Sequence, residues 1–210
     1  NIEALAAGSK NLIKHIENIK TVFKLPCIVA LNKFVTDTDE EIEFIRVVSK
    51  KAGADFEIAD IWANGGNGGK ALAAKVAETA SAFTGSLEYA YPLKSTVEEK
   101  IEQIAKRIYG ADGVTFEKEA LDEIARLNDL FDTDALPVCI AKTQYSLSDD
   151  MTKLGRPIGF KINIREIKYR AGAGVIIAVA GKIMLMPGLS KTPAATGMTI
   201  SKGGTIKGLF

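Results

Sequence analysis

Apolar runs and polar loops alternate between residues 1 and 92 in the order that is typical of a parallel α/β segment. Apolar residues at 27–31 and 56–59 predict two strands. Between them, the capping box Thr38-Asp39-Glu40-Glu41 predicts a helix that begins near Asp39 and ends at Gly53. We expect this helix to connect two parallel, neighbouring strands. Its predicted buried stripe consists of Ile42, Ile45 and Val48.

The residues before the first strand predict an amphipathic helix over 9–23. Its apolar stripe has the spacing of one helix face and consists of Leu12, Ile16, Ile19 and Phe23. The other faces are expected to be solvent-exposed and carry Lys10, Lys14, Glu17 and Lys20. His15, the only histidine, lies among these charges, and we assign it no catalytic role because no second histidine exists.

Two further helices and two short strands are predicted between residues 93 and 141. Ser95 and Thr96 each begin a capping box, and the helix that follows should end at Gly110. It is expected to bury Val97, Ile101, Ile104 and Ile108. A strand at 114–116 precedes a helix whose apolar residues are Leu121, Ile124, Leu127 and Phe131. Residues 137–141 are the next predicted strand.

From Gly159 the hydrophobic periodicity changes to two residues. The apolar positions are even up to Ile164 and odd from Ile167, and such a change of face within one strand predicts a β-bulge. The turn Ala171–Gly174 leads into a second strand at 175–180, antiparallel to the first. It is no dinucleotide fingerprint, because another strand follows and the third glycine is missing.

Residues 184–195 contain Pro187 and Pro193 and are expected to be irregular. Gly203-Gly204 predicts a hairpin turn between strands at 198–201 and 205–209. The fold class is therefore α/β: a parallel βαβ segment followed by an α+β unit with antiparallel strands. We expect two domains, residues 1–92 and residues 93–210, joined by a linker around Pro92.

Composition narrows the possible partners. The chain is 47% hydrophobic and 25% charged, with a net charge of +1, which argues against a nucleic-acid-binding protein. No apolar run approaches the roughly 20 residues of a membrane-spanning helix, so no membrane partner is expected. Cys27 and Cys139 lie in apolar runs and are interpreted as small buried side chains. Two thiols without metal-ligand spacing favour a reducing compartment, and we expect a cytoplasmic protein.

The loops that follow the first two strands carry large aromatic side chains, Phe34 and Trp62. Because parallel strands end at one edge of a sheet, both rings would leave the same edge, which suggests a slot for a flat ring. The alternative is that both rings pack in the core. The acidic residues at 37–41 are interpreted as helix caps rather than as a metal site. We assign no metal ligand and no catalytic residue in this chain.

The glycine-rich stretch after Trp62 is similar to a phosphate-binding loop only superficially. In the Walker pattern, Asn64 would occupy the position of the first glycine and Ala71 that of the Mg-binding hydroxyl. We expect the glycines to turn the backbone into a helix that carries Leu72, Val76 and Phe83. Lys142, after the strand at 137–141, is interpreted as a surface lysine, with an anion contact as the alternative. The roles of Lys142 and of Gly172–Gly174 stay open.

Several ordered segments along the whole chain carry a resemblance to one known family. They are residues 11–18, Asn32-Lys33-Phe34, Thr36–Asp39, Trp62–Gly66, Ala141–Ser146, Ala171–Gly174, Met186–Leu189, Pro193–Ala195 and Gly208-Leu209-Phe210. Together they resemble formate–tetrahydrofolate ligase, also called formyltetrahydrofolate synthetase. Arg170 departs from the family, which often has a small residue there. Val35 departs as well, since the family often has proline after the phenylalanine.

The resemblance implies an enzyme that joins formate, ATP and tetrahydrofolate into formyl-tetrahydrofolate through formyl phosphate, with Mg bound to ATP. It also implies that Phe34 and Trp62 hold the folate pterin between them, with Val35 as an apolar wall. The family carries its phosphate loop in an N-terminal portion, which has no counterpart here. We therefore expect this chain, which begins without methionine, to be the C-terminal part of a longer enzyme and inactive alone.

Two functions follow from that expectation. In the first, the chain supplies the folate-binding side of a cytoplasmic, homotetrameric ligase whose small-molecule partners are formate, tetrahydrofolate and ATP. In the second, the chain is a structural and oligomerisation module of the same enzyme and has no ligand affinity of its own. The sequence leaves open the residual folate affinity, the oligomeric state, the Mg and monovalent-cation contacts, and the polyglutamate preference.

Overall fold

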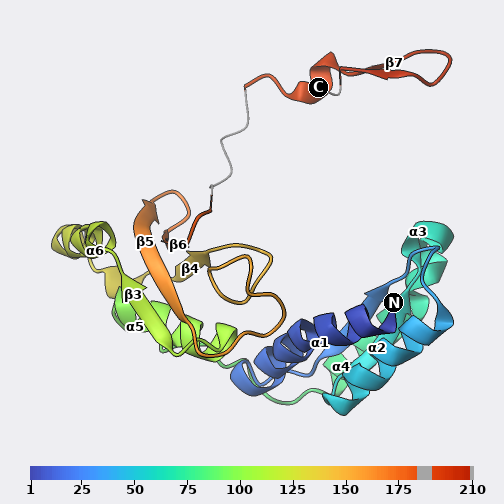
Figure 1. The fold of residues 1–210 in the computed structure, drawn as a ribbon, viewed down its shortest axis with the longest axis horizontal. Coiled ribbons are helices and arrows are strands. Elements are labelled where there is room, and N and C mark those ends of the chain that lie inside the picture. Colours follow the sequence, from blue (N-terminus) through green and yellow to red (C-terminus); the bar gives the residue numbers. More distant parts are fainter. Residues whose placement is uncertain (184–190, 209–210) are drawn as a thin grey trace.

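The computed structural model describes residues 1–183 and 191–208, and Figure 1 shows the arrangement of their elements. The first part of the chain contains helices α1, α2, α3 and α4, the π-helix η1, the 3₁₀ helix η2 and strands β1 and β2. In chain order their bounds are α1 Ile2–Glu17, η1 Asn18–Val22, β1 Ile28–Asn32, α2 Asp39–Lys51, β2 Asp55–Ala59, α3 Ile61–Asn64, η2 Gly65–Gly69 and α4 Lys70–Ala82.

The predicted βαβ unit is confirmed. Strands β1 and β2 pair in parallel, with Ile28 opposite Asp55 and Asn32 opposite Ala59. Helix α2 connects them, and Thr38 caps it through the predicted box: its hydroxyl accepts from the Glu41 N–H, and the Glu41 carboxylate accepts from the Thr38 N–H. The capping interpretation of the acidic turn therefore holds for Glu41.

The core of this first unit is small. Its buried members are Ile42, Ile45 and Phe56, and side chains from α1, β1 and β2 pack around them. Val48, which we expected in the buried stripe, is only partly buried, and Ser49 is buried instead. Helix α4 has no buried residue, and its Val76 is 48% exposed. The unit thus leaves apolar surface uncovered on the α4 side.

The second part of the chain contains one larger sheet and its helices. The bounds are α5 Val97–Gln103, η3 Ile104–Tyr109, β3 Gly113–Phe116, α6 Lys118–Leu130, η4 Thr133–Ala135, β4 Val138–Ala141, β5 Lys161–Arg170, β6 Val175–Ala180, η5 Ala194–Gly197, β7 Thr199–Ile200 and β8 Ile206–Lys207. The short strands β7 and β8 form the predicted antiparallel hairpin. The motif Met186–Leu189, Leu209 and Phe210 lie outside the described residues.

The larger sheet has the strand order β3-β5-β6-β4 and mixed pairing. Strands β5 and β6 are antiparallel, as predicted for residues 159–180, whereas β3–β5 and β4–β6 are parallel. The β5–β6 register shifts between Ile164 and Glu166, which confirms the β-bulge. The bulge lets Ile164 and Ile167, on either side of it, both be buried.

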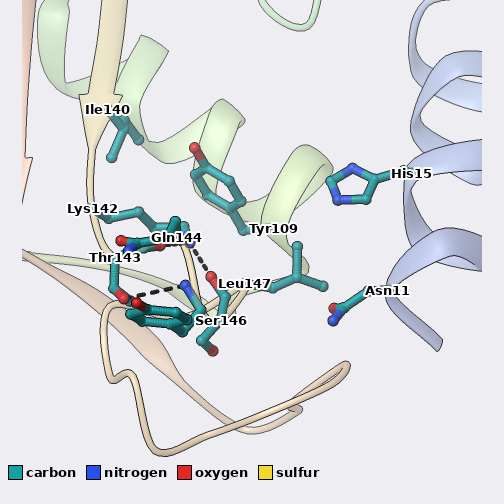
Figure 2. Close-up of a pocket in the computed structure, with 10 residues that line it drawn as sticks. Asn11, His15, Tyr109, Ile140, Lys142, Thr143, Gln144, Ser146 and Leu147 are labelled. Carbon is teal, nitrogen blue, oxygen red and sulfur yellow. Dashed lines mark hydrogen bonds between the residues drawn. The ribbon is translucent and has the colours of Figure 1, made fainter. Parts of the chain in front are cut away.

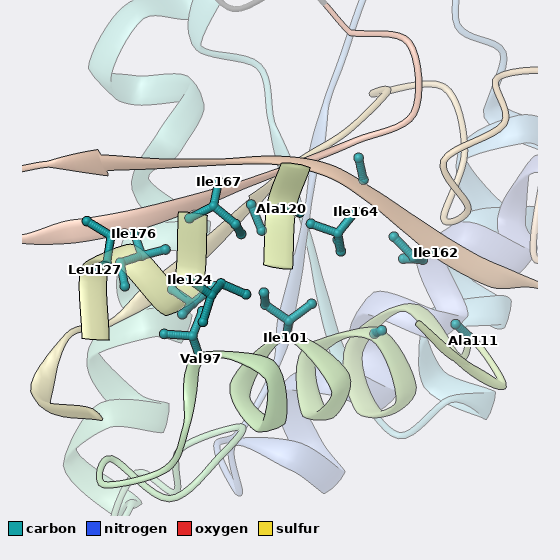
Figure 3. Packing of buried hydrophobic residues seen from close by; sticks show 14 of the residues in the cluster. Val97, Ile101, Ala111, Ala120, Ile124, Leu127, Ile162, Ile164, Ile167 and Ile176 are labelled. Atoms are coloured by element: carbon teal, nitrogen blue, oxygen red, sulfur yellow. The ribbon is translucent and has the colours of Figure 1, made fainter. Parts of the chain in front are cut away.

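Helices α5 and α6 pack against this sheet and enclose the main core (Figure 3). In Figure 3, Val97 and Ile101 of α5 point toward the strand that carries Ile164 and Ile167. On α6, Ile124 and Leu127 are buried as expected, but Leu121 is 44% exposed and Ala120 is buried instead. The buried stripe of α6 therefore consists of Ala120, Ile124 and Leu127, and Leu121 lies outside it.

Lys100 lies inside this core region and is fully buried. Its ammonium donates hydrogen bonds to the Asp134 carbonyl at 2.6 Å and the Leu136 carbonyl at 2.8 Å. Burial lowers the pKa of Lys100, and the nearby Asp134 and Asp132 carboxylates oppose that shift. The ammonium therefore fixes the segment that leads into β4.

Thr96, rather than Ser95, caps α5, because its hydroxyl accepts from the Glu99 N–H and the Glu99 carboxylate accepts from the Thr96 N–H. We expect Thr96→Ala to lower the free energy of unfolding by about 1 kcal/mol, as loss of an N-cap usually does. Urea denaturation of Ser95→Ala provides the control, and it should show a clearly smaller loss. Equal losses in the two variants would contradict the assignment of the cap.

Side chains of α1 and η1 contact the end of helix η3. Lys14 donates to the Arg107 carbonyl at 2.9 Å, and Asn18 donates to the Ile108 carbonyl at 2.9 Å. These are carbonyls of a helix C-terminus, which a cation stabilises. The prediction that Lys14 lies on a solvent-exposed face is therefore wrong: Lys14 is 7% exposed, whereas His15 is exposed as expected.

Candidate functional site

The loop between β1 and α2 holds Phe34 in a tight turn. The Phe34 N–H donates to the Asp37 carboxylate at 2.8 Å, and the Asp37 N–H donates to the Phe34 carbonyl at 3.1 Å. Asp37 thus fixes the backbone of Phe34, while the phenyl ring remains 63% exposed. Val35, at the tip of the same turn, is 83% exposed. Residues 34–37 therefore form a short loop that is held by its own hydrogen bonds and exposes two apolar side chains to solvent.

The loop after β2 is closed by its own backbone. The Asp60 N–H donates to the Gly68 carbonyl at 3.1 Å, and the Asn64 amide donates to the Asp60 carboxylate at 2.9 Å. Gly68 lies so close that a β-carbon on it would sit 2.0 Å from the Asp60 carbonyl oxygen. This closure holds the short helix α3, on which Trp62 is 84% exposed.

Both aromatic loops follow the carboxyl ends of β1 and β2, so they leave the sheet at the same end. The strands are parallel, and the Lys33 N–H still donates to the Ala59 carbonyl beyond the last strand pair. Phe34 follows β1 by two residues and Trp62 follows β2 by three, on strands that lie about 4.8 Å apart. The core interpretation of the two rings is wrong, because both are largely exposed. Their shared sheet edge agrees with the prediction from strand order.

The main side-chain feature of this end of the sheet is the pair of exposed aromatic rings. Among residues 1–183 and 191–208, no three His, Cys, Asp or Glu side chains gather as a metal site. The glycine-rich stretch forms η2 and enters α4 without a side-chain cap, so it turns the chain as expected. With Ala71 in place of the Mg-binding hydroxyl, these residues do not fit ATP and Mg.

A second hollow lies between α1 and the loop that follows β4. It has a volume of about 310 Å³ and is lined by side chains that include Asn11, His15, Tyr109 and Lys142 (Figure 2). Lys142 donates to the carbonyls of Thr143 and Ser146, and its Nζ lies 4.7 Å from the centre of the Tyr109 ring. The surface-lysine interpretation of Lys142 is wrong, since the side chain is half-buried.

These contacts give Lys142 a structural role in the loop. Burial lowers the pKa of Lys142, and the Asp149 carboxylate opposes the shift. Burial also raises the pKa of Tyr109. Two carbonyls and an aromatic face surround the ammonium, so its hydrogen-bonding capacity is largely used within the chain. The sequence offered a weak signal for this role, namely a lysine placed directly after an apolar strand.

Further charged side chains with internal roles carried no local signal. Lys100 and Lys14 each donate to carbonyls that lie far away in the sequence.

The two cysteines differ from the prediction that both are buried. Cys139 is exposed on β4, while Cys27 is partly buried. None of the described helices is both long and apolar enough to cross a membrane.

Comparison with known protein families gives one finding. A family model described as formate–tetrahydrofolate ligase matches residues 1–210, which is the entire sequence. The match includes both aromatic loops and the β4 loop that contains Lys142.

Proposed function

Because the chain belongs to the formate–tetrahydrofolate ligase family, we propose that it supplies the folate-binding side of this ligase. In this proposal Phe34 and Trp62 hold the flat pterin ring between them, and Val35 forms an apolar wall beside it. The chain is the C-terminal part of a longer, cytoplasmic, homotetrameric enzyme. ATP, Mg and formate bind to a portion that contains the phosphate loop.

One observation carries the proposal: two large aromatic side chains project into solvent from adjacent strand ends, each on a loop fixed by its own hydrogen bonds. Large apolar side chains lose favourable burial when they are exposed, by roughly 25 cal/mol per Å². Ligands of open α/β sheets bind at the carboxyl ends of the strands, where both rings lie. Rings carried on loops whose backbones are already held by hydrogen bonds favour an aromatic ligand, because little further ordering of the loop backbone is needed on binding.

The family's reaction has two chemical steps, formation of formyl phosphate and transfer of the formyl group to folate. Formyl phosphate is made from formate and ATP, and a folate nitrogen then attacks the formyl carbon, which releases phosphate. Formation of formyl phosphate needs cationic groups and Mg around the transferring phosphoryl group. This chain's own residues would orient the pterin and shield its reacting face from water, and they carry no step of phosphoryl transfer.

The proposal is tested by titrating the chain with tetrahydrofolate and assaying it for formate-dependent ADP release. Trp62 is the only tryptophan, so a change in its fluorescence reports on the proposed site alone. We expect saturable quenching by tetrahydrofolate and no ADP release, because positioning and charge stabilisation of the phosphoryl group supply most of the rate. Formate-dependent ADP release, or absence of any quenching, would contradict the proposal.

The alternative function is a structural and oligomerisation module without ligand affinity. The uncovered apolar surface of α4 favours it. Light scattering beside the same titration separates the two functions. A stable oligomer that leaves Trp62 fluorescence unchanged at every tetrahydrofolate concentration would support the module.

A further inference from the structure

The hydrogen bonds of the β1–β2 sheet continue without a gap into the loop that carries Phe34. One residue beyond the strand pairing, the Lys33 N–H donates to the Ala59 carbonyl at 3.1 Å. The next amide along the chain, that of Phe34, donates to the Asp37 carboxylate at 2.8 Å. The side chain of Asp37 therefore takes over at the point where the neighbouring strand ceases to hold the backbone.

Asp37 binds both main-chain polar groups of Phe34. The Asp37 N–H donates to the Phe34 carbonyl at 3.1 Å, which is the first-to-fourth-residue hydrogen bond of a β-turn over residues 34–37. Its carboxylate accepts from the Phe34 N–H, so the turn is closed from both sides by one residue. Side-chain rotamers depend on the local backbone, and Asp37 thereby limits the directions in which the Phe34 ring can point.

The loop that carries the second ring is closed in another way. Around Trp62, the closing contact is a main-chain hydrogen bond from the Asp60 N–H to the Gly68 carbonyl. The turn at Phe34 depends in addition on a side chain, and a hydrogen bond to a carboxylate is stronger than one between neutral groups. The position of Phe34 can therefore be altered by a single substitution that leaves the ring itself in place.

We propose that Asp37 is a positioning residue for tetrahydrofolate, which acts by holding Phe34 where it stacks on the pterin. This inference rests on the proposed folate site. A ring that has to be ordered at the moment of binding costs affinity, whereas a loop ordered in advance does not. Asp37 thus contributes to tetrahydrofolate affinity through Phe34, by fixing the turn before the ligand arrives.

Isothermal calorimetry with tetrahydrofolate, applied to the chain and to variants at positions 37 and 39, tests this role. We expect Asp37→Ala to weaken binding at least about fivefold, which is about 1 kcal/mol. Asp37→Asn keeps a side-chain oxygen that can accept from the Phe34 N–H, so it should restore most of the affinity. Asp39→Ala is the matched control, because Asp39 is an exposed carboxylate in the first turn of α2, and this variant should bind like the original chain. Equal losses in Asp37→Ala and Asp39→Ala would overturn the proposal.

Hydrogen exchange of the ligand-free chain measures the positioning without folate. The Phe34 amide should exchange at least about tenfold faster in Asp37→Ala, because its acceptor is missing, and should stay protected in Asp39→Ala. Unchanged exchange at Phe34 in Asp37→Ala would overturn the proposal whatever the calorimetric result. If Asp37→Ala melted far below the original chain, Asp37 would support the fold rather than the ring, which would also overturn it.

The same measurements distinguish failure of this inference from failure of the folate site. If Trp62→Ala weakens tetrahydrofolate binding but Asp37→Ala binds like the original chain, only the role of Asp37 is overturned. If the original chain binds no tetrahydrofolate although Phe34 exchange depends on Asp37, the proposed folate site fails, and the role of Asp37 in binding fails with it.

Discussion

Replacement of Lys100 by methionine should lower the free energy of unfolding by about 3 kcal/mol. Two charge-assisted hydrogen bonds are lost, each contributing roughly 1.5–3 kcal/mol, while removal of a buried charge offsets part of the loss. The carbonyls of Asp134 and Leu136 would remain without their donor. Methionine fills the volume of the lysine stem, so the change is chiefly one of hydrogen bonding and charge.

Urea denaturation provides the measurement, and Lys106→Met provides the matched control. Lys106 follows Lys100 in the adjoining helix η3 and forms a surface ion pair with Glu102, with both side chains nearly half exposed. Exposed pairs of this kind contribute at most about 1 kcal/mol. If the two variants lost equal stability, burial of Lys100 would not be the reason for its importance.

Replacement of Trp62 by alanine should weaken tetrahydrofolate binding by at least about tenfold, which is about 1.4 kcal/mol. Stacking contributes about 0.5–1.5 kcal/mol per aromatic ring, and the lost apolar contact adds roughly 25 cal/mol per Å². Trp62→Phe should lose less, since an aromatic face remains. The melting temperature should stay nearly constant, because Trp62 is 84% exposed.

Isothermal calorimetry is the suitable measurement, since the variant has lost its only tryptophan. Ile61→Ala on the same short helix is the control, because Ile61 is also exposed but is not one of the two proposed stacking rings. Unchanged tetrahydrofolate affinity in a folded Trp62→Ala chain would contradict the proposal that Phe34 and Trp62 hold the pterin between them. A large drop in melting temperature would instead indicate that Trp62 supports the fold.

The sequence correctly predicted the structural features that depend on residues close together in the chain. The capping boxes at Thr38 and Thr96, the bulge between Ile164 and Glu166, and the antiparallel pair β5–β6 were all readable from spacing. Each depends on residues only a few positions apart or on strict alternation along one strand. That Phe34 and Trp62 leave the same end of the sheet followed from one further step, the parallel direction of the two strands in a βαβ unit.

The roles of Lys14 and Lys142 could not be predicted, because the partners of both are backbone carbonyls whose positions depend on the fold. Lys14 looked like part of a charged helix face, yet its ammonium meets the end of η3. Lys142 looked like a surface residue, yet it donates within its own loop beneath Tyr109. A periodic pattern records where apolar side chains lie, but not where a flexible cation can reach a free carbonyl.

The close contact at Gly68 has a consequence for natural sequence variation and for directed evolution of this loop. A β-carbon there would overlap the Asp60 carbonyl oxygen at 2.0 Å, whereas one on Gly66 would meet nothing within 4 Å. Two glycines that look alike in an alignment therefore tolerate substitution very differently. Libraries randomised at position 66 can diversify the rim of the loop, while position 68 admits only glycine if Trp62 is to keep its place. The shape of the loop thus depends on the lack of a β-carbon at Gly68.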